Sequence, residues 1–256
     1  MKHFLAFTQK EALEQRRSGK LLFLGILFAL FGIMNPAVAK LTPWLLEVMA
    51  DALAQSGMTV TEVTVTALDS WVQFFKNIPM ALIAFALLEG SIFTKEYQTG
   101  TLVLSLTKGL KRHTVVLSKA AVLTVLWSAG YWLCFAITYG YNAYYWDNTI
   151  AQNLMFSAVC WWVLGLWIIG LLALFSVLSG ASAGVYLGTG AVALICSLLQ
   201  FLPKLQKYLP TALADGNSLI YGLKSPADYM PALVIAAGMA LGCFAASIPI
   251  FRKKQL

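Results

Sequence analysis

The longest polar interruption between apolar stretches that also carries a dense positive bias lies between Lys95 and Lys119. A short apolar stretch, Leu102–Leu106, sits inside this segment between Gly100 and Gly109. One acid, Glu96, is accompanied by five cations: Lys95, Lys108, Lys111, Arg112 and Lys119. This combination suits binding, because apolar side chains can enter a groove while cations meet acidic groups around it. The segment is predicted to form a brief amphipathic helix that docks on a soluble partner.

A second candidate is Glu89, a single acid within an apolar stretch, six residues before Lys95. In a regular helix this spacing places the carboxylate ~9 Å inside the membrane edge. Ionisable groups at such depth commonly mark ion or substrate pathways. The alternative is a carboxylate that turns toward the helix bundle or reaches lysines at the interface. Asn35 and Pro36, near the end of the first apolar stretch, are the other intramembrane candidates.

The residues that most catalytic and metal-binding classes require are missing from the sequence. No glycine-rich loop precedes Lys-Ser/Thr, so we expect no nucleotide hydrolysis by this chain. His3 and His113 lie in separate polar segments without metal-ligand spacing. The four cysteines fall in apolar stretches without disulfide or metal spacing. We therefore expect no catalytic site, no metal site, no cofactor bound by this chain and no nucleic-acid partner.

The elements that position these residues follow from composition. Of the 256 residues, 59% are hydrophobic and 11% are charged, with a mean hydropathy of +0.74. Soluble domains carry about 25% charged residues. The chain is therefore predicted to be an all-α integral membrane protein that forms a single transmembrane domain over residues 1–256.

Hydropathy predicts six transmembrane helices, because each apolar stretch is close to the ~20 residues that cross a bilayer. Their expected ranges are about 21–39, 71–94, 115–141, 154–178, 183–201 and 229–251. Asn35-Pro36 is expected to bend or end the first helix, since proline lacks an amide donor. Residues 1–20 are expected to form an amphipathic helix on the inner leaflet. A separate external helix is expected over Pro43–Gln55, with proline in its first turn.

Charge bias predicts the orientation of these spans. With both termini inside, 13 of the 18 Lys and Arg residues face the cytoplasm and 5 face outside. This asymmetry satisfies the positive-inside rule. Both termini and the 95–119 segment, between spans 2 and 3, are therefore expected to be cytoplasmic. The chain is expected in the plasma membrane of a bacterium, in contact with membrane lipids.

The central segment resembles the signature of type-2 ABC transporter permeases. The resemblance is carried by Glu96-Tyr97-Gln98-Thr99-Gly100-Thr101, the leucine-rich turn after it, and then Lys108, Arg112 and Lys119. The stretch from Asn35 to Pro43 is also similar to the end of the first span in one subgroup. The span count and the amphipathic amino-terminal segment agree with the layout of that family.

The resemblance implies a mechanism and a set of partners. Two permeases, identical or paralogous, would pair, and each would dock on a cytosolic ATPase that binds ATP and magnesium. The segment after span 2 would be the coupling helix. ATP-driven closure of the ATPases would rock the spans and move an amphipathic or hydrophobic cargo, such as a peptide, out of the cell. The coupling residues implied are Glu96, Gly100, Thr101, Leu102, Leu104, Leu106, Lys108 and Arg112.

Two other functions fit the same residues. The chain could be a membrane module that recruits a cytosolic partner for assembly or sensing, without transport. It could also be an ion-coupled transporter that uses Glu89. Copurification with an ATPase distinguishes the exporter from these two functions. Dependence of transport on a proton gradient distinguishes the ion-coupled transporter from the other two.

Overall fold

The computed structural model describes residues 2–49, 64–92, 94–98, 100, 107 and 111–253. All regular secondary structure in these residues is helical. The elements are α1 (Lys2–Arg17), α2 (Lys20–Val48), α4 (Ala67–Glu89), α5 (Thr94–Gln98), α7 (Arg112–Tyr145), η1 (Asn148–Ile150), α8 (Leu154–Leu178), α9 (Ser182–Leu199), η2 (Gln206–Tyr208), η3 (Pro210–Ala214), α10 (Gly216–Ile220) and α11 (Pro226–Lys253).

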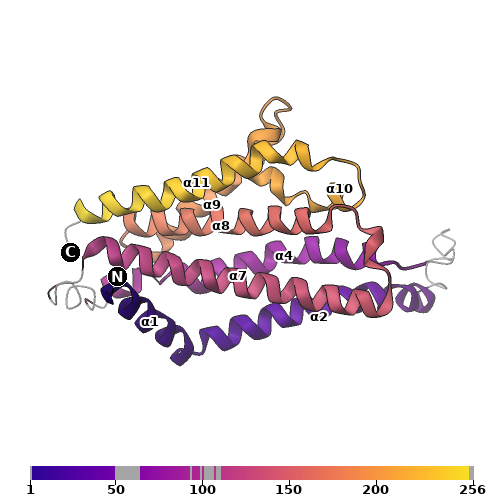
Figure 1. Ribbon diagram of the computed structural model, residues 1–256, viewed down its shortest axis with the longest axis horizontal. Helices are drawn as coiled ribbons and strands as arrows, with labels where there is room; N and C mark the ends of the chain where they lie inside the picture. Colours follow the sequence, from indigo (N-terminus) through magenta and orange to yellow (C-terminus); the bar gives the residue numbers. More distant parts are fainter. Residues whose placement is uncertain are drawn as a thin grey trace.

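Six helices in the described part of the chain are long and apolar enough to cross a membrane: α2, α4, α7, α8, α9 and α11. They run along the long axis of the molecule, with α2 against α4 and α7, and α8 against α9 and α11 (Figure 1). The prediction of an all-helical, multi-pass membrane protein with six spans is confirmed. The fourth span begins and ends at the predicted residues, 154 and 178.

The first span departs from its prediction. The helix does not end at Asn35-Pro36 but continues as α2 through Pro36 and Pro43 to Val48. Proline at position 36 removes the amide that would bond to the Gly32 carbonyl. The hydroxyl of Thr138 on α7 donates to that carbonyl instead, at 3.0 Å. A neighbouring helix thus replaces the missing bond, and the prediction of a separate external helix starting at Pro43 is wrong.

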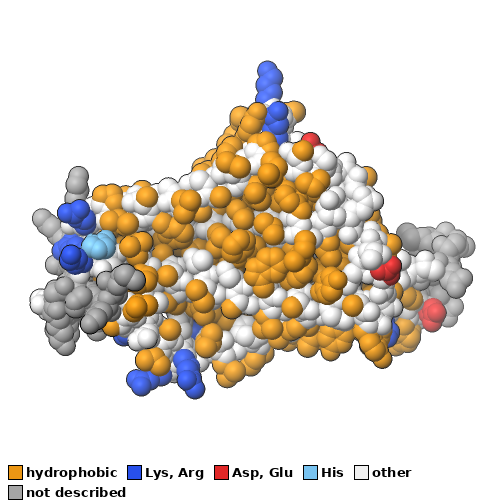
Figure 2. All heavy atoms as spheres, in the orientation of Figure 1, with side chains coloured by type: hydrophobic (Ala, Val, Ile, Leu, Met, Phe, Trp, Pro, Cys, Tyr) orange, Lys and Arg blue, Asp and Glu red, His pale blue; other side chains and the backbone are white. Residues whose placement is uncertain are grey.

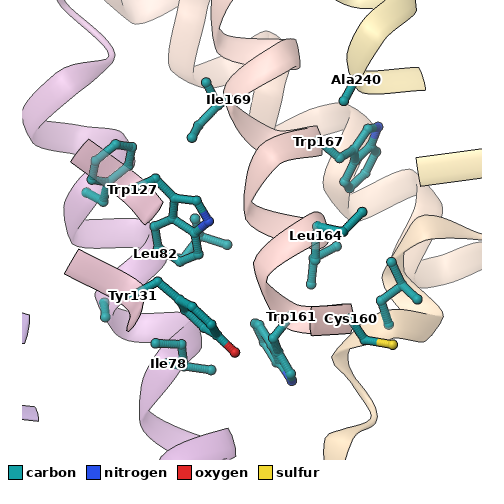
Figure 3. Close-up of a cluster of buried hydrophobic side chains, with 14 of the residues drawn as sticks. Ile78, Leu82, Trp127, Tyr131, Cys160, Trp161, Leu164, Trp167, Ile169 and Ala240 are labelled. Carbon is teal, nitrogen blue, oxygen red and sulfur yellow. The ribbon is translucent and has the colours of Figure 1, made fainter. Parts of the chain in front are cut away.

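An aromatic core joins α4, α7 and α8 (Figure 3). The Tyr131 hydroxyl donates to the Ala158 carbonyl at 2.7 Å, and the Trp127 indole donates to the Trp162 carbonyl at 3.1 Å. A Cβ at Gly165 would lie 2.2 Å from the Trp127 ring, so only glycine leaves room for the indole. Because lipid is as apolar as the core, close packing of this kind and interhelical hydrogen bonds hold membrane helices together.

The first and last helices share one end of the bundle. Helix α1 and the final turns of α11 both lie there, together with the start of α7 (Figure 1). On the face shown in Figure 2, most Lys and Arg side chains gather at the same end. The assignment of this end to the cytoplasm stays a prediction that rests on the positive-inside rule.

Candidate functional site

Buried charges meet beneath α1, at the end of the bundle where the 95–112 segment begins and ends. We name this group the charge cluster. Its members are Lys10, Glu11, Gln15, Lys20, Glu89, Glu96 and Lys119. They come from α1, from the first residue of α2, from the last residue of α4, from α5 and from α7. The cluster therefore connects five helices.

Helix α1 contributes one face of the site. Phe7, Glu11 and Gln15 are buried and recur at intervals of four residues, which places them on one side of the helix. Leu5 and Leu13 are exposed. The predicted amphipathic helix is present, but it docks on the bundle with a polar stripe and turns these apolar residues away from it.

Lys119 is the centre of the cluster. Its side chain is 2% exposed. Its ammonium lies 2.8 Å from a Glu11 carboxylate oxygen and 3.1 Å from one of Glu96, and it donates to the Ile92 carbonyl at 3.0 Å. Three oxygens therefore surround one buried cation. A charge removed from water needs such partners, because desolvation alone costs several kcal/mol per ion.

Lys10 completes a ring with the same two carboxylates. Its ammonium lies 2.5 Å from Glu96 and 3.0 Å from Glu11. Partial burial opposes the charge of Lys10, but the hydrogen bonds to Glu96 and Glu11 outweigh it, so the pKa of Lys10 is raised above its ordinary value. Two cations and two anions thus balance within the ring.

Glu89 joins the opposite side of α1 to α2 and α4. It is fully buried, and the Gln15 amide donates to its carboxylate at 2.5 Å. Lys20 lies 3.7 Å from the other carboxylate oxygen and donates to the Leu88 carbonyl at 2.7 Å. Of the two sequence interpretations, these contacts match the carboxylate that faces the bundle and reaches an interfacial lysine.

The carboxylates of the charge cluster have two possible uses, metal binding and pairing with lysines. Carboxylate oxygens of Glu11, Glu14 and Glu96 approach within 4.8 Å of one another, a spacing that a metal ion could use. The ammonium groups of Lys10 and Lys119 already neutralise Glu11 and Glu96. The cavity beside them is small, about 30 Å³. We infer that the cluster ties helices together.

The other predicted site residues are distributed as follows. Arg112, at the start of α7, donates to the carbonyls of Phe251 and Arg252 on α11, at 3.2 and 3.3 Å. Gly100 has a φ of +69°, a left-handed conformation that favours glycine. Thr101, Leu102, Leu104, Leu106 and Lys108 lie outside the described residues.

Asn35 and Pro36 belong to a separate polar group within the bundle. The Asn77 amide donates to the Asn35 oxygen at 2.8 Å, and the Asn35 amide donates to the Thr138 hydroxyl at 3.1 Å. With the bond from Thr138 to the Gly32 carbonyl, these contacts link α2, α4 and α7. The sequence singled out Asn35 but not its partners, because Asn77 and Thr138 occur singly in apolar helices.

Sequence reasoning also missed the partners of Glu89 and Glu96 on α1. Two signals were available: the four-residue spacing of Phe7, Glu11 and Gln15, and the position of Lys119 seven residues after the start of α7, within an otherwise apolar stretch. Both indicate polar groups that need a partner inside the bundle.

Comparison with known proteins adds one relative. No family model matches the chain. The chain is 27% identical over 224 residues to a protein of Bacillus subtilis (strain 168) named "Uncharacterized transmembrane protein YxlG", and the match covers 82% of this chain and 81% of that protein. The similarity to a transmembrane protein along most of both chains agrees with the six apolar helices of the structure.

Proposed function

We propose that this chain is the membrane-spanning permease subunit of an ATP-driven ABC exporter. A separate cytosolic ATPase would bind ATP and magnesium and dock on the segment between α5 and α7. The observation that carries the proposal is that both ends of this segment are bonded to other helices. Glu96 is held by Lys10 and Lys119, and Arg112 bonds to the backbone of α11.

These contacts give the segment a mechanical role. A displacement applied between Glu96 and Arg112 would reach α1 and α7 through the charge cluster and α11 through Arg112. Buried, hydrogen-bonded charge pairs resist separation, because an unpaired charge in a low-dielectric site is costly. The helices would therefore move as packed units between two arrangements, which is how domain-scale switching proceeds in close-packed proteins.

The surface of the bundle supports a hydrophobic or amphipathic cargo and a second permease. Large apolar side chains are exposed along α2 and α9, including Leu22, Ile26 and Leu30 on the former and Leu187 and Leu194 on the latter. In the proposal, one face of these helices borders the pathway or a second copy, and the rest contacts lipid.

Copurification tests the proposal. The tagged chain is coexpressed with the ATP-binding cassette protein encoded beside it, and ATPase recovery and vanadate-sensitive hydrolysis are measured. Leu104→Asp places a charge on the proposed docking surface and is expected to abolish recovery. Leu223→Asp is the matched control, since Leu223 is exposed in the connection between α10 and α11. Full recovery with Leu104→Asp would refute the docking role.

Glu96 is unsuited to this docking test. Its side chain is buried in contacts within the chain, so Glu96→Arg would disrupt the charge cluster whether or not an ATPase binds. Loss of a complex in that variant would report on α1 and α7, and not on the docking surface.

A specific observation keeps ion-coupled transport as a second candidate. One oxygen of the buried Glu89 carboxylate has no hydrogen-bond donor among the described residues. Transport that depends on a proton gradient and is lost in Glu89→Gln, with no effect of ATPase depletion, would favour this candidate. Transport that needs ATP and persists without a proton gradient would exclude it.

A further inference from the structure

The connection between α9 and η3 projects sideways from the bundle, across the direction of the long helices (Figure 1). We name residues 200–208 the lateral loop. It ends in the short helix η2 and carries four exposed apolar or aromatic side chains: Phe201, Leu202, Leu205 and Tyr208. Phe201 is 84% exposed. Cationic side chains extend from the tip of this projection (Figure 2), where the sequence has Lys204 and Lys207.

The length of α9 sets the height of the lateral loop. Helix α9 starts at the α1 end of the bundle, where Ser182 bonds to Thr94 of α5. Its 18 residues span ~27 Å, close to the ~30 Å thickness of a hydrocarbon core. Helix α7 has 34 residues and spans ~51 Å, nearly twice the length of α9. The lateral loop thus leaves the bundle about one hydrocarbon-core thickness from the α1 end.

A cavity of about 510 Å³ opens beside the lateral loop. Gln200, Gln206 and Lys207 line it on the side of the loop, and Asp215, Lys224 and Tyr229 line it on the side of α10 and α11. The cavity is therefore bordered by the lateral loop on one side and by polar groups of α10, α11 and the connection between them on the other.

The acids of the cavity already have partners. Asp215 accepts from Lys224 at 2.8 Å, from the Ser218 hydroxyl at 2.8 Å and from the Tyr229 hydroxyl at 3.1 Å. Asp228 accepts from the Ser225 amide at 2.9 Å and from its hydroxyl at 3.0 Å. The bonds to Asp228 all reach Oδ2, one of its two carboxylate oxygens, whereas both oxygens of Asp215 accept.

The cations of the lateral loop differ in this respect. Among the described residues, no carboxylate lies within 4 Å of the Lys204 or Lys207 ammonium group. The contact of Lys207 is with the Tyr208 ring, 5.1 Å from its centroid. The side-chain amides of Gln200 and Gln206 add further donors. Lys207 therefore gives the loop side of the cavity an ammonium group that no carboxylate of the described residues neutralises.

We propose that the lateral loop and its cavity bind the phosphate headgroup of an anionic phospholipid. Lys207, which lines the cavity, and Lys204, on the same loop, would pair with the phosphate. The glutamine amides would donate to the headgroup, and the acyl chains would pack against Phe201 and Leu202. Basic groups beside apolar side chains at an interface attract anionic lipid in this way. The site does not depend on the exporter proposal, since it needs only the membrane and the fold.

Lipid binding to the delipidated protein in neutral detergent tests the site. Phosphatidylglycerol and phosphatidylcholine of equal chain length are added separately, and bound lipid is counted by native mass spectrometry. We expect the wild type to bind phosphatidylglycerol at least tenfold more tightly. Each Lys→Gln change at positions 204 and 207 is expected to weaken that binding about fivefold. K204R/K207R, which keeps both charges, should retain the preference.

Lys76→Gln is the control, because it removes one exposed lysine of α4 outside the cavity. Equal weakening by Lys76→Gln would overturn the proposal in favour of a general charge effect. Equal binding of the two lipids, or equal competition by inorganic phosphate alone, would also overturn it. A lateral loop that instead holds a second copy would show a dimer that Phe201→Ser dissociates, with no lipid preference. Unchanged melting of K204Q/K207Q without lipid would show that the loss of binding is not a folding defect.

Discussion

Lys119→Met is the sharpest test of the charge cluster. The substitution keeps a long apolar side chain of similar length and removes the buried ammonium. Glu11 and Glu96 then lose contacts at 2.8 and 3.1 Å, and among the described residues the cation they still share is Lys10, whose side chain is 46% exposed. The expected consequence is loss of the docked position of α1, because two carboxylates would share one partly solvated cation.

The magnitude follows from the burial of the group. Removing one partner of a buried ion pair costs about 3–5 kcal/mol. Since Lys10 still neutralises part of the charge, we expect the lower end, about 3 kcal/mol. At about 2–4 °C per kcal/mol for chains approaching this size, the melting temperature should fall by roughly 6–12 °C.

The assay combines thermal unfolding in detergent with limited proteolysis at Arg16 and Arg17, which are exposed at the end of α1. Faster cleavage there would show that α1 undocks before the bundle unfolds. Lys95→Met is the matched control, because Lys95 is 61% exposed and lies 3.6 Å from a half-exposed Glu14. Exposed pairs of this type contribute about 0–1 kcal/mol.

A double variant separates pairing from packing. Glu11→Gln with Lys119→Met removes both members of the 2.8 Å contact, so it should destabilise less than the sum of the single changes. If Lys119→Met shifted melting no more than Lys95→Met, or if the double variant were strictly additive, the idea that the cluster fastens α1 would be untenable.

Three further predictions concern other parts of the fold. Gly165→Ala should destabilise the fold by about 1–3 kcal/mol, because the new Cβ would lie 2.2 Å from the Trp127 indole. Gly190→Ala is the control, since its Cβ would meet nothing within 4 Å, and equal melting temperatures of the two variants would contradict the packing argument. Asn35→Ala should cost about 1 kcal/mol through its two interhelical amide bonds, and unfolding indistinguishable from wild type would show that those bonds contribute nothing. Burial opposes the charge of Asp215, but hydrogen bonds from Lys224 and Ser218 outweigh burial and lower the pKa of Asp215. The ionised carboxylate therefore stabilises the fold above its unfolded pKa of about 3.9, and this stabilisation is lost as pH falls through the lower folded pKa. Melting measured against pH should therefore show an acid loss that Asp215→Asn lacks, and parallel curves would be inconsistent with this.

Local sequence rules performed well for the spans and poorly at proline. Hydropathy predicted residues 154–178 as a helix with the observed ends, because an uninterrupted apolar stretch in a bilayer must satisfy its own backbone bonds. At Pro36 the local rule predicted a bend or an end. The outcome depended on Thr138, 102 residues away, whose hydroxyl replaces the lost backbone donor. No pattern within α2 contains that information.

Glu89 and Glu96 show the same division within the candidate site. Their rarity in an apolar, basic context was enough to single them out, since a charge at membrane depth must have a partner. Which partner was left open, because the interfacial lysines, a docking protein and α1 were all compatible with the sequence.

The amino-acid sequence alone determined the helical membrane architecture, the number of spans and which end of the bundle is rich in Lys and Arg. Each of these depends on hydropathy and charge within one segment. The folded arrangement alone decided that α1 covers both glutamates and that Lys119 stands between Glu11 and Glu96. The physical reason is range: burial of a helix in lipid is a property of about 20 consecutive residues. The neutralisation of a buried charge is a property of atoms within about 4 Å, and Lys119 and Glu11, which make such a contact, are 108 positions apart.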